Sequence, residues 1–407
     1  LVEEKGVQIA PSTVRQLVAE LRCSKPEAFI PLEFESGDVM QVDWGDAYAY
    51  LAGVSTPVSI FCAVLPYSGA LFAGMFPNKS MESFLLGHQL AFEFFGGIPR
   101  RCMYDNLKTA VATGSGLSAV KQERFALFEA HYAFQAVFCR AASGWEKGSV
   151  ENSVKTIRTL ILTPAPTAQD FQELQELAVN RCLNYLQTHK IRDHQRPVRE
   201  DFVVEKASLL PFPKSHMEIG QVVPALVHSD CTVRFEKTMY SVPWSAVGKK
   251  VTLRATPFSI FIYHEGQLLA EHKRTYIAGN HQYVPEHYLE LLERRPRSQA
   301  DAKPLKSGVW PQEFKVFRSL YCGDELNQEL VKLLRLSEVV GKQQLLTALA
   351  TANASPPPTY TSVLFHLEQA GVAINAIDTI AVSQVDLNSY DKLFEGGRDK
   401  DDNNGTD

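Results

Sequence analysis

The sequence has little cysteine and no closely spaced cysteine pair. Its 407 residues include seven cysteines, and none of them forms a Cys-x-x-Cys motif. An odd number of widely separated cysteines among apolar neighbours argues against a disulfide framework and against a zinc site. We therefore expect free thiols, as in a reducing cytoplasm. The cysteines are Cys23, Cys62, Cys102, Cys139, Cys182, Cys231 and Cys322.

A long hydrophobic run is also missing. The longest apolar stretches, around residues 51–65 and 83–98, are interrupted by Gly, Pro, Ser or charged residues. Because a membrane helix needs about 20 mostly apolar positions, we expect no membrane span. No signal peptide precedes the first expected helix, and the sequence begins without Met.

Two motifs that would indicate other chemistry are missing as well. No GxxxxGK[ST] phosphate loop occurs, so we do not expect the chain itself to be an ATPase. The eleven histidines show no HExxH motif and no other ligand-like spacing, so none is assigned to a metal.

The net charge of −5 argues at first against a nucleic-acid partner. Its distribution changes that interpretation, because residues 386–407 hold seven acids and three bases, a net of −4. The first 385 residues are therefore close to neutral, and basic clusters remain possible among them. The acidic tail, with its Gly and Asn residues, is expected to be disordered.

The length predicts several domains, about two to four, because one compact core does not grow to this size. Hairpin strands followed by alternating helices and strands indicate an α/β domain with a mixed sheet. Strands are expected at 39–44, 47–54, 57–65, 70–76, 100–104 and 136–142, and helices at about 80–95, 121–134, 147–162 and 167–189.

Different patterns flank this domain. Short strands at 232–236, 239–242, 250–255, 259–263 and 268–272 suit a small β-barrel. Helices follow at about 286–295, 311–321, 326–351 and 359–371. At the front, residues 10–22 predict a helix capped by Ser12. That helix is either an ordinary amphipathic one or the last helix of a helix-turn-helix whose earlier helices precede residue 1.

Asp43 is out of place in the strand pattern, because it lies among Met40, Val42 and Trp44. An ionised carboxylate is costly to bury without a partner. Two more acids have comparable settings: Asp105 directly follows an expected strand, and Glu151 lies beside the apolar stripe of an expected helix. Any one of them alone is more simply explained by a turn cap or by pairing with Arg or Lys.

Together the three acids favour a different explanation. Carboxylates in mid-strand, at a strand's end and on a helix can converge at one edge of a sheet. Converging carboxylates repel each other unless a cation lies between them. Oxygen ligands with room for water suit Mg²⁺ or Mn²⁺. Two such ions about 4 Å apart can serve displacement at a phosphodiester.

With these acids in place, the sequence resembles the IstA-type insertion-sequence transposases. These are members of the DDE transposase and retroviral-integrase superfamily, with an RNase H-like catalytic fold. The resemblance covers roughly residues 10–280 and implies that Asp43, Asp105 and Glu151 are the metal ligands of a site for two Mg²⁺ or Mn²⁺ ions. It is carried by "LEFESGDVMQVDWGD" (32–46), "FFGGIPRRCMYDNLKTAV" (94–111), "GWEKGSVENSVKTIR" (144–158) and "HQRPVREDF" (194–202).

The resemblance and the patterns together predict a multidomain chain. Its segments are the end of a helix-turn-helix DNA-binding region (1–24), a linker (25–38), an RNase H-like DDE catalytic domain (39–190), a connector (191–227), a small β-barrel (228–280), a helical C-terminal region (281–385) and a disordered acidic tail (386–407).

The function that the resemblance implies is DNA transposition. The enzyme would cleave element ends to free 3′-hydroxyls and join these to target DNA. The alternatives are a DNA-binding regulator without catalysis and an RNase H-like metal-dependent nuclease without strand transfer. The implied partners are element-end and target DNA, further copies of the chain on paired ends, and a separate AAA+ helper ATPase, IstB. The implied location is the bacterial cytoplasm, in association with the nucleoid.

Basic and polar side chains supply the candidate DNA contacts. Lys155 and Arg158 follow Glu151 by four and seven residues and so share its helix face. In the expected barrel, basic residues outnumber acids, although a solvated surface would look the same. The candidates are Lys155, Arg158, Arg15, Gln16, Lys249, Lys250 and Arg254.

Neighbouring polar and aromatic residues are interpreted more simply. Asp46 lies at a glycine and is expected to cap the hairpin, with metal ligation as the weaker alternative. Trp44 and Trp145 are expected to be core or rim aromatics, and Asn106 and Asn152 to make local hydrogen bonds.

Overall fold

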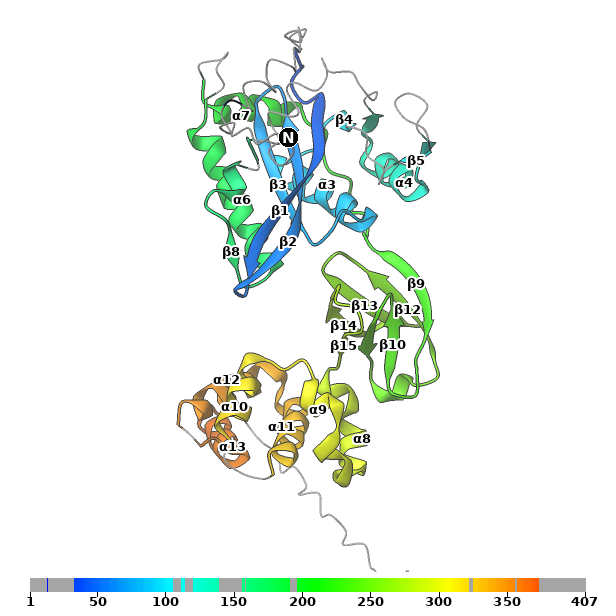
Figure 1. The fold of residues 1–407 in the computed structure, drawn as a ribbon, viewed down its shortest axis with the longest axis vertical. Helices are drawn as coiled ribbons and strands as arrows, with labels where there is room; N and C mark the ends of the chain where they lie inside the picture. Colours follow the sequence, from blue (N-terminus) through cyan, green and yellow to red (C-terminus); the bar gives the residue numbers. More distant parts are fainter. Residues whose placement is uncertain are drawn as a thin grey trace, which may run out of the picture. The chain divides into compact units, whose positions relative to one another are not determined.

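The structure is a computed structural model that describes residues 13, 33–104, 111–113, 120–138, 156–157, 159–190, 196–321, 325–355 and 357–372. The chain divides into two compact units, Leu1–Ala225 with Val251–Tyr276 and Leu226–Lys250 with Ile277–Asp407 (Figure 1). The helix expected over 10–22, with Arg15 and Gln16, and the acidic tail lie outside the described residues.

The first unit is built on a mixed sheet, as the sequence predicts. Its strand order is β3-β2-β1-β4-β7, and the short β8 also pairs with β1. The neighbours β1, β2 and β3 are antiparallel, whereas β4 and β8 run parallel to β1, and β7 runs parallel to β4. The strands are β1 (Val39–Leu51), β2 (Val54–Leu65), β3 (Ala70–Phe76), β4 (Arg101–Tyr104), β7 (Gln135–Phe138) and β8 (Thr167–Ala168).

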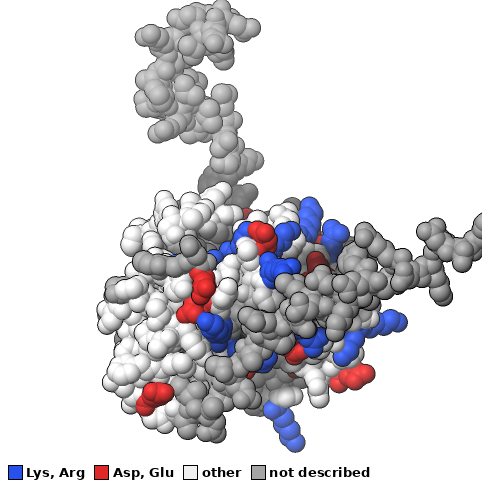
Figure 2. Space-filling view, turned by 90° about the horizontal axis from the view of Figure 1, so that it is seen from below, with Lys and Arg blue, Asp and Glu red and all other residues white. Residues whose placement is uncertain are grey.

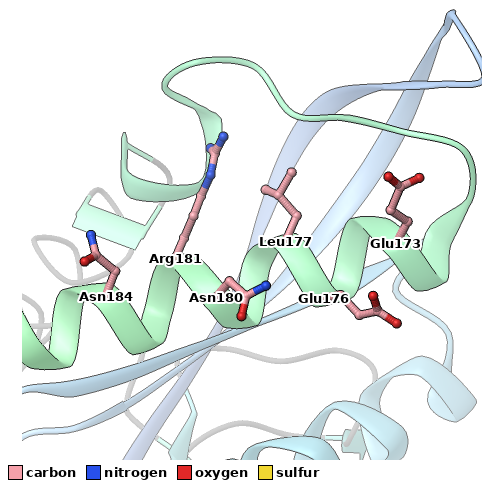
Figure 3. Close-up of a pocket in the computed structure, with 6 residues that line it drawn as sticks. All are labelled: Glu173, Glu176, Leu177, Asn180, Arg181 and Asn184. Atoms are coloured by element: carbon pink, nitrogen blue, oxygen red, sulfur yellow. The ribbon is translucent and has the colours of Figure 1, made fainter.

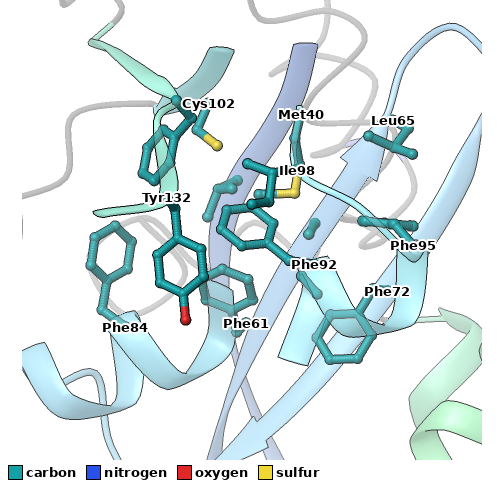
Figure 4. Close-up of a cluster of buried hydrophobic side chains, with 14 of the residues drawn as sticks. Met40, Phe61, Leu65, Phe72, Phe84, Phe92, Phe95, Ile98, Cys102 and Tyr132 are labelled. Atoms are coloured by element: carbon teal, nitrogen blue, oxygen red, sulfur yellow. The ribbon is translucent and has the colours of Figure 1, made fainter. Parts of the chain in front are cut away.

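Side chains that alternate along β1 divide the core of this unit into two layers. Met40 and Val42 belong to a cluster with helices α3 (Met81–Phe95) and α4 (Glu123–Tyr132), shown in Figure 4. Ala47 and Ala49 belong to a second cluster, which includes Ile157 and buried residues of helix α6 (Phe171–Thr188). Helices therefore cover both faces of the sheet.

The helix ends explain why these helices begin and stop where they do. Ser80 accepts a hydrogen bond from the Ser83 amide and so caps the start of α3, and Gly96 ends α3 with a left-handed φ of 76°. Asp170 accepts from the amides of Gln172 and Glu173 at the start of α6. This cap is why α6 begins at residue 171, later than the expected 167.

Two further sheets occupy the region expected to form a barrel. The first has the order β14-β13-β12-β9, and the second has the order β10-β11-β15. The strands agree closely with the expected ranges, but hydrogen bonding between described residues leaves the sheets separate, so a closed barrel remains a prediction. The strands are β9 (Gln221–Leu226), β10 (Thr232–Phe235), β11 (Thr238–Ser241), β12 (Lys250–Ala255), β13 (Ser259–His264), β14 (Gln267–Lys273) and β15 (His281–Gln282).

Strands β13 and β14 of the four-stranded sheet belong to the first unit, where their region contacts the mixed sheet and α6. Phe258, in the turn before β13, stacks on Phe76 of β3 with 5.7 Å between the ring centroids. Lys273 of β14 pairs with Asp170 at the start of α6, with 3.1 Å between Nζ and Oδ2. Helix α7 (Val198–Ser208) and strand β9 lie within the range expected to be a connector, so that range contains regular structure.

Helices follow the strands in the second unit. The single helix expected over 326–351 is two helices, because Gly341 adopts a φ of 87° between them. None of the described helices is long and apolar enough to cross a membrane. The helices are α8 (Leu289–Arg294), α9 (Lys303–Ser307), α10 (Gln312–Leu320), α11 (Leu326–Val340), α12 (Lys342–Asn353) and α13 (Tyr360–Gln369).

A glycine in α3 tests the packing of the sheet. A Cβ atom built on Gly87 would lie 2.6 Å from the ring of Phe61. Alanine favours a helix over glycine by about 1 kcal/mol, but overpacking a core costs about 1–3 kcal/mol. Gly87→Ala should therefore lower the free energy of unfolding by up to about 2 kcal/mol in urea titrations.

The matched control on the same helix is Glu93→Ala, which changes an exposed residue and should shift the free energy of unfolding by less than about 0.5 kcal/mol. A Gly87→Ala protein that is more stable than wild type would contradict the close contact with Phe61.

Candidate active site

Asp43 lies in the middle of β1, where it pairs with Cys62 of β2. Its Oδ1 accepts a hydrogen bond from the Trp44 amide at 2.7 Å, and the residue is half-buried. By strand alternation its side chain is on the same sheet face as Ala47 and Ala49. The aspartate thus lies on the sheet face that α6 covers, and this hydrogen bond orients its carboxylate.

Strand β4 ends beside Asp43. The parallel register pairs Val42 of β1 with Tyr104, the last residue of β4. Asp105 follows Tyr104 directly in the sequence but lies outside the described residues. Tyr104, the residue before Asp105, therefore lies next to the part of β1 that carries Asp43.

The helix expected to carry Glu151 is described in part. Ile157 and Ile161 are fully buried, as the apolar stripe of that helix predicts. Both pack in the cluster on the Asp43 side of the sheet, together with Ile60 of β2. Glu151, Lys155 and Arg158 themselves lie outside the described residues.

Arg181 of α6 holds the end of this helical segment. Its Nη1 donates to the carbonyl oxygens of Ile161 at 2.5 Å, Pro164 at 3.0 Å and Leu160 at 3.4 Å. The last carbonyls of a helix have no partner within it, and a cation is favourable there. Arg181 therefore fixes the segment that contains Ile161, a role that no motif in the sequence indicates.

The same arginine borders a surface depression of about 430 Å³ on α6 (Figure 3). Figure 3 shows the side chain of Arg181 directed toward the neighbouring loop. The guanidinium of Arg181 is already hydrogen-bonded to backbone carbonyls. The residues that line the depression include no other cation that could bind an anionic ligand. Its lining residues are Glu173, Glu176, Leu177, Asn180, Arg181 and Asn184.

A buried histidine holds the end of β4 in a similar way. His88 of α3 is fully buried, with Nδ1 2.7 Å from the Phe84 carbonyl oxygen and Nε2 2.8 Å from the Tyr104 hydroxyl. A carbonyl can only accept, so Nδ1 donates to it and the neutral ring accepts from Tyr104 at Nε2. Burial lowers the pKa of His88 to about 4. No motif or spacing in the sequence indicates this contact.

The residues beside Asp43 have structural partners. Asp46 was expected to cap a hairpin, but β1 continues to Leu51, and Asp46 instead pairs with Lys79, with 2.7 Å between Oδ2 and Nζ. Trp44 packs edge-on against Phe61 and Phe76, with centroid distances of 5.4 and 5.8 Å. Trp44 is half-buried against the core, which agrees with its expected role as a core or rim aromatic.

The predicted DNA contacts on β12 differ from one another. Lys249 and Lys250 are exposed at the start of the strand. Arg254 is occupied within the protein, because its guanidinium pairs with Glu218, donates to the Tyr263 hydroxyl at 2.8 Å and lies 5.0 Å from the Phe261 ring centroid. These contacts give Arg254 partners within the protein, and its contact with DNA stays a prediction.

No group of three His, Cys, Asp or Glu side chains is placed to hold a metal within the described part of the chain. Two of the three expected ligands, Asp105 and Glu151, lie outside that part. Asp43 fits a site for a hard cation, because it offers an oriented carboxylate.

Comparison with known proteins identifies the family. Residues 212–284 match the family described as Mu transposase, C-terminal domain. The transposase for insertion sequences IS1326/IS1353 of Pseudomonas aeruginosa is 32% identical over 349 residues, which cover 83% of this chain and 67% of that protein. The chain belongs to the insertion-sequence transposases.

Two further transposases are similar over most of this chain. A transposase of Aminobacter aminovorans is 30% identical over 356 residues, covering 85% of this chain and 69% of that protein. The transposase of the insertion sequence element IS21 of Pseudomonas aeruginosa is 24% identical over 308 residues, covering 75% and 78%.

Among solved structures, the HTLV-2 integrase catalytic core domain in complex with magnesium overlaps 41% of this chain and 97% of its own, with a TM-score of 0.31 and 13% identity. A simian T-cell lymphotropic virus intasome overlaps 65% of this chain and 92% of its own, with a TM-score of 0.34 and 11% identity.

The transposase should lose stability in weak acid because of His88. The pKa of this side chain is about 4 in the folded protein and about 6.5 when unfolded, so between these values the unfolded state binds the extra proton. Stability from this group is complete above pH 6.5 and falls as the pH drops toward 4, by about 3 kcal/mol in total. Urea unfolding between pH 4.5 and 7.5 measures this dependence.

His88→Gln should flatten the slope of the free energy of unfolding against pH by an amount that corresponds to about one proton. His189→Gln, at an exposed position of the same unit, should leave that slope unchanged. Equal slopes for wild type and His88→Gln would show that His88 is not buried in its neutral form.

Proposed function

We propose that this transposase cleaves the ends of its element and joins them to target DNA at a single site formed by Asp43, Asp105 and Glu151. The observation that carries the proposal is the position of Asp43 on β1 beside the end of β4. The packing of Ile157 and Ile161 on the same sheet face supports it. The mixed sheet agrees with the α/β domain that the sequence predicts.

Backbone geometry supports the approach of the two aspartates. Neighbouring strands lie about 4.8 Å apart, and consecutive Cα atoms are about 3.8 Å apart. Since Tyr104 pairs with Val42, Asp105 and Asp43 are the next residues along two parallel neighbours. If the helix of Ile157 extends toward its N-terminus as the sequence predicts, Glu151 lies about 9 Å along its axis from Ile157.

The chemistry of the donors suits Mg²⁺ or Mn²⁺. Three carboxylates that converge would repel one another and need a cation between them. Two bound divalent ions would supply activation of the attacking oxygen and stabilisation of the leaving oxygen. The protein itself holds the carboxylates in place. The Trp44 amide orients Asp43, and the contact between Tyr104 and His88 holds the end of β4. Arg181 holds the segment that follows Glu151 in the sequence.

Cleavage and joining are the same kind of displacement at phosphorus. In cleavage, water attacks the phosphorus at the element end, and the bond to the 3′ oxygen breaks to leave a free 3′-hydroxyl. In joining, that hydroxyl attacks a phosphodiester of the target, a new P–O bond forms, and a target 3′-hydroxyl leaves. Neither step needs a covalent bond between protein and DNA.

The partners follow from this reaction. One site handles one end, so two ends cut together require at least two copies of the chain on paired element ends. We also propose a separate AAA+ helper ATPase, IstB, for target selection.

Lys155 and Arg158 are proposed to contact the DNA next to the cut, because they share the helix face of Glu151. A regulator without catalysis or a nuclease without strand transfer would produce no joined DNA.

Replacing any of the three ligands tests the site. Asp43→Asn, Asp105→Asn and Glu151→Gln should each reduce joining of labelled element-end DNA in Mg²⁺ by at least about 10³-fold, because each removes a charged ligand. Binding of the same DNA should remain nearly intact, since phosphate contacts elsewhere are unchanged.

Asp46→Asn is the matched control, because Asp46 lies on the same strand and pairs with Lys79. It should retain near wild-type joining. Near-full activity of any triad variant in Mg²⁺ would remove that residue from the proposed site.

Lys249 and Lys250 are proposed to contact the DNA backbone. Lys249→Glu/Lys250→Glu should weaken binding to all sequences alike and lower the slope of log affinity against log salt by about 2, since each phosphate contact contributes about 0.9. Filter binding at several salt concentrations measures this slope. The control Lys190→Glu/Lys214→Glu, also at exposed positions, should retain the wild-type slope, and an unchanged slope in the first variant would contradict the contact.

A further inference from the structure

The second unit carries an uneven set of charges on α8, α9 and the 3₁₀ turn between them, η4 (Pro296–Asp301). Over residues 289–307 there are five basic and three acidic residues. Figure 2 shows Lys and Arg side chains, with Asp and Glu side chains among them, on the face of the molecule seen from below. The charge that this segment offers to a ligand depends on which of its cations are paired with acids.

Each acid of the segment is engaged by a cation other than Arg295, Arg297 or Lys303. The ion pairs are Glu290 with Arg294 at 3.5 Å, Glu293 with Arg335 of α11 at 2.6 Å, and Asp301 with Lys306 at 2.7 Å. Arg295, Arg297 and Lys303 are exposed and have no ion pair among the described residues. Three uncompensated positive charges therefore lie on one short segment.

The segment is held in a fixed shape. Gln299 of η4 is buried, and its Nε2 donates to the Leu292 carbonyl oxygen at 3.0 Å. Asn327 of α11 donates to the Gln299 carbonyl oxygen at 3.1 Å. These bonds fix η4 against α8 and α11, so its backbone does not need to be ordered when a partner binds.

The neighbouring depression favours an extended anion over a small one. It has a volume of about 300 Å³ and is lined by Arg295 and Lys303, but also by Asp230, Tyr283 and Tyr288. The carboxylate of Asp230 would repel a small anion that entered. An extended polyanion that lies across the exposed cations would not have to enter the depression.

We propose that Arg295, Arg297 and Lys303 form a second backbone-binding surface for duplex DNA. The proposal rests on the proposed function, which supplies DNA as the polyanion. Side chains of this type bind phosphates without reading the bases and release counterions from the duplex. The surface therefore adds affinity for element-end and target DNA alike and has no part in catalysis.

The test compares two double variants of the full chain. Arg295→Gln/Lys303→Gln removes two of the proposed contacts. The control Lys315→Gln/Lys342→Gln removes equal charge from the exposed Lys315 of α10 and from Lys342, which pairs with Glu286. Binding of element-end and unrelated duplexes is measured at several salt concentrations, with thermal unfolding to check the fold and joining to check activity.

The first variant should lose affinity at least tenfold for both duplexes and lower the salt slope by about 2, with an unchanged melting temperature. The control should behave like wild type. Equal losses in both variants, or no loss in either, would overturn the proposal and leave the surface to an acidic protein partner. If the wild-type chain neither binds nor joins DNA, the proposed function fails as well.

Discussion

The parallel pairing of β1 with β4 is the constraint on which the candidate site depends. It places Val42 opposite Tyr104, so the two strands lead into Asp43 and toward Asp105 side by side. A slip of one residue would turn Asp43 to the other face of the sheet, among the aromatic side chains that pack beneath α3. The buried pair of His88 and Tyr104 holds the end of β4 in this register. A core contact thus supports the geometry of the site.

Much of the fold could be predicted from the sequence because it depends on local patterns. Strand β3 has the expected ends, and α3 ends at Phe95, the expected last residue of its helix. The break at Gly341 was missed, because a glycine within an apolar pattern does not reveal its backbone angle. Local sequence patterns predict only part of the candidate site. Asp43 is conspicuous as an acid in a core strand, whereas Arg181 and His88 act through contacts that no local pattern records.

For basic residues too, the residue type does not reveal which groups surround the side chain in the folded protein. Arg254 was expected to face DNA, but it is paired with Glu218 and packed against Phe261 and Tyr263. Arg295 and Lys303 are not among the expected DNA contacts, yet the acids near them in the sequence are paired with other cations. A count of charges therefore describes the surface less well than the ion pairs do, because an ion pair removes a cation from the set available to a polyanion.

The most direct measurement of the central claim is anomalous scattering from Mn²⁺ in crystals of the transposase grown with element-end DNA. Our account predicts strong peaks within about 2.5 Å of carboxylate oxygens of Asp43, Asp105 and Glu151, since divalent ions bind oxygen ligands at about 2.0–2.6 Å. Peaks that lie away from Asp43, or an Asp43 carboxylate bonded only to protein groups while DNA occupies the site, would contradict it.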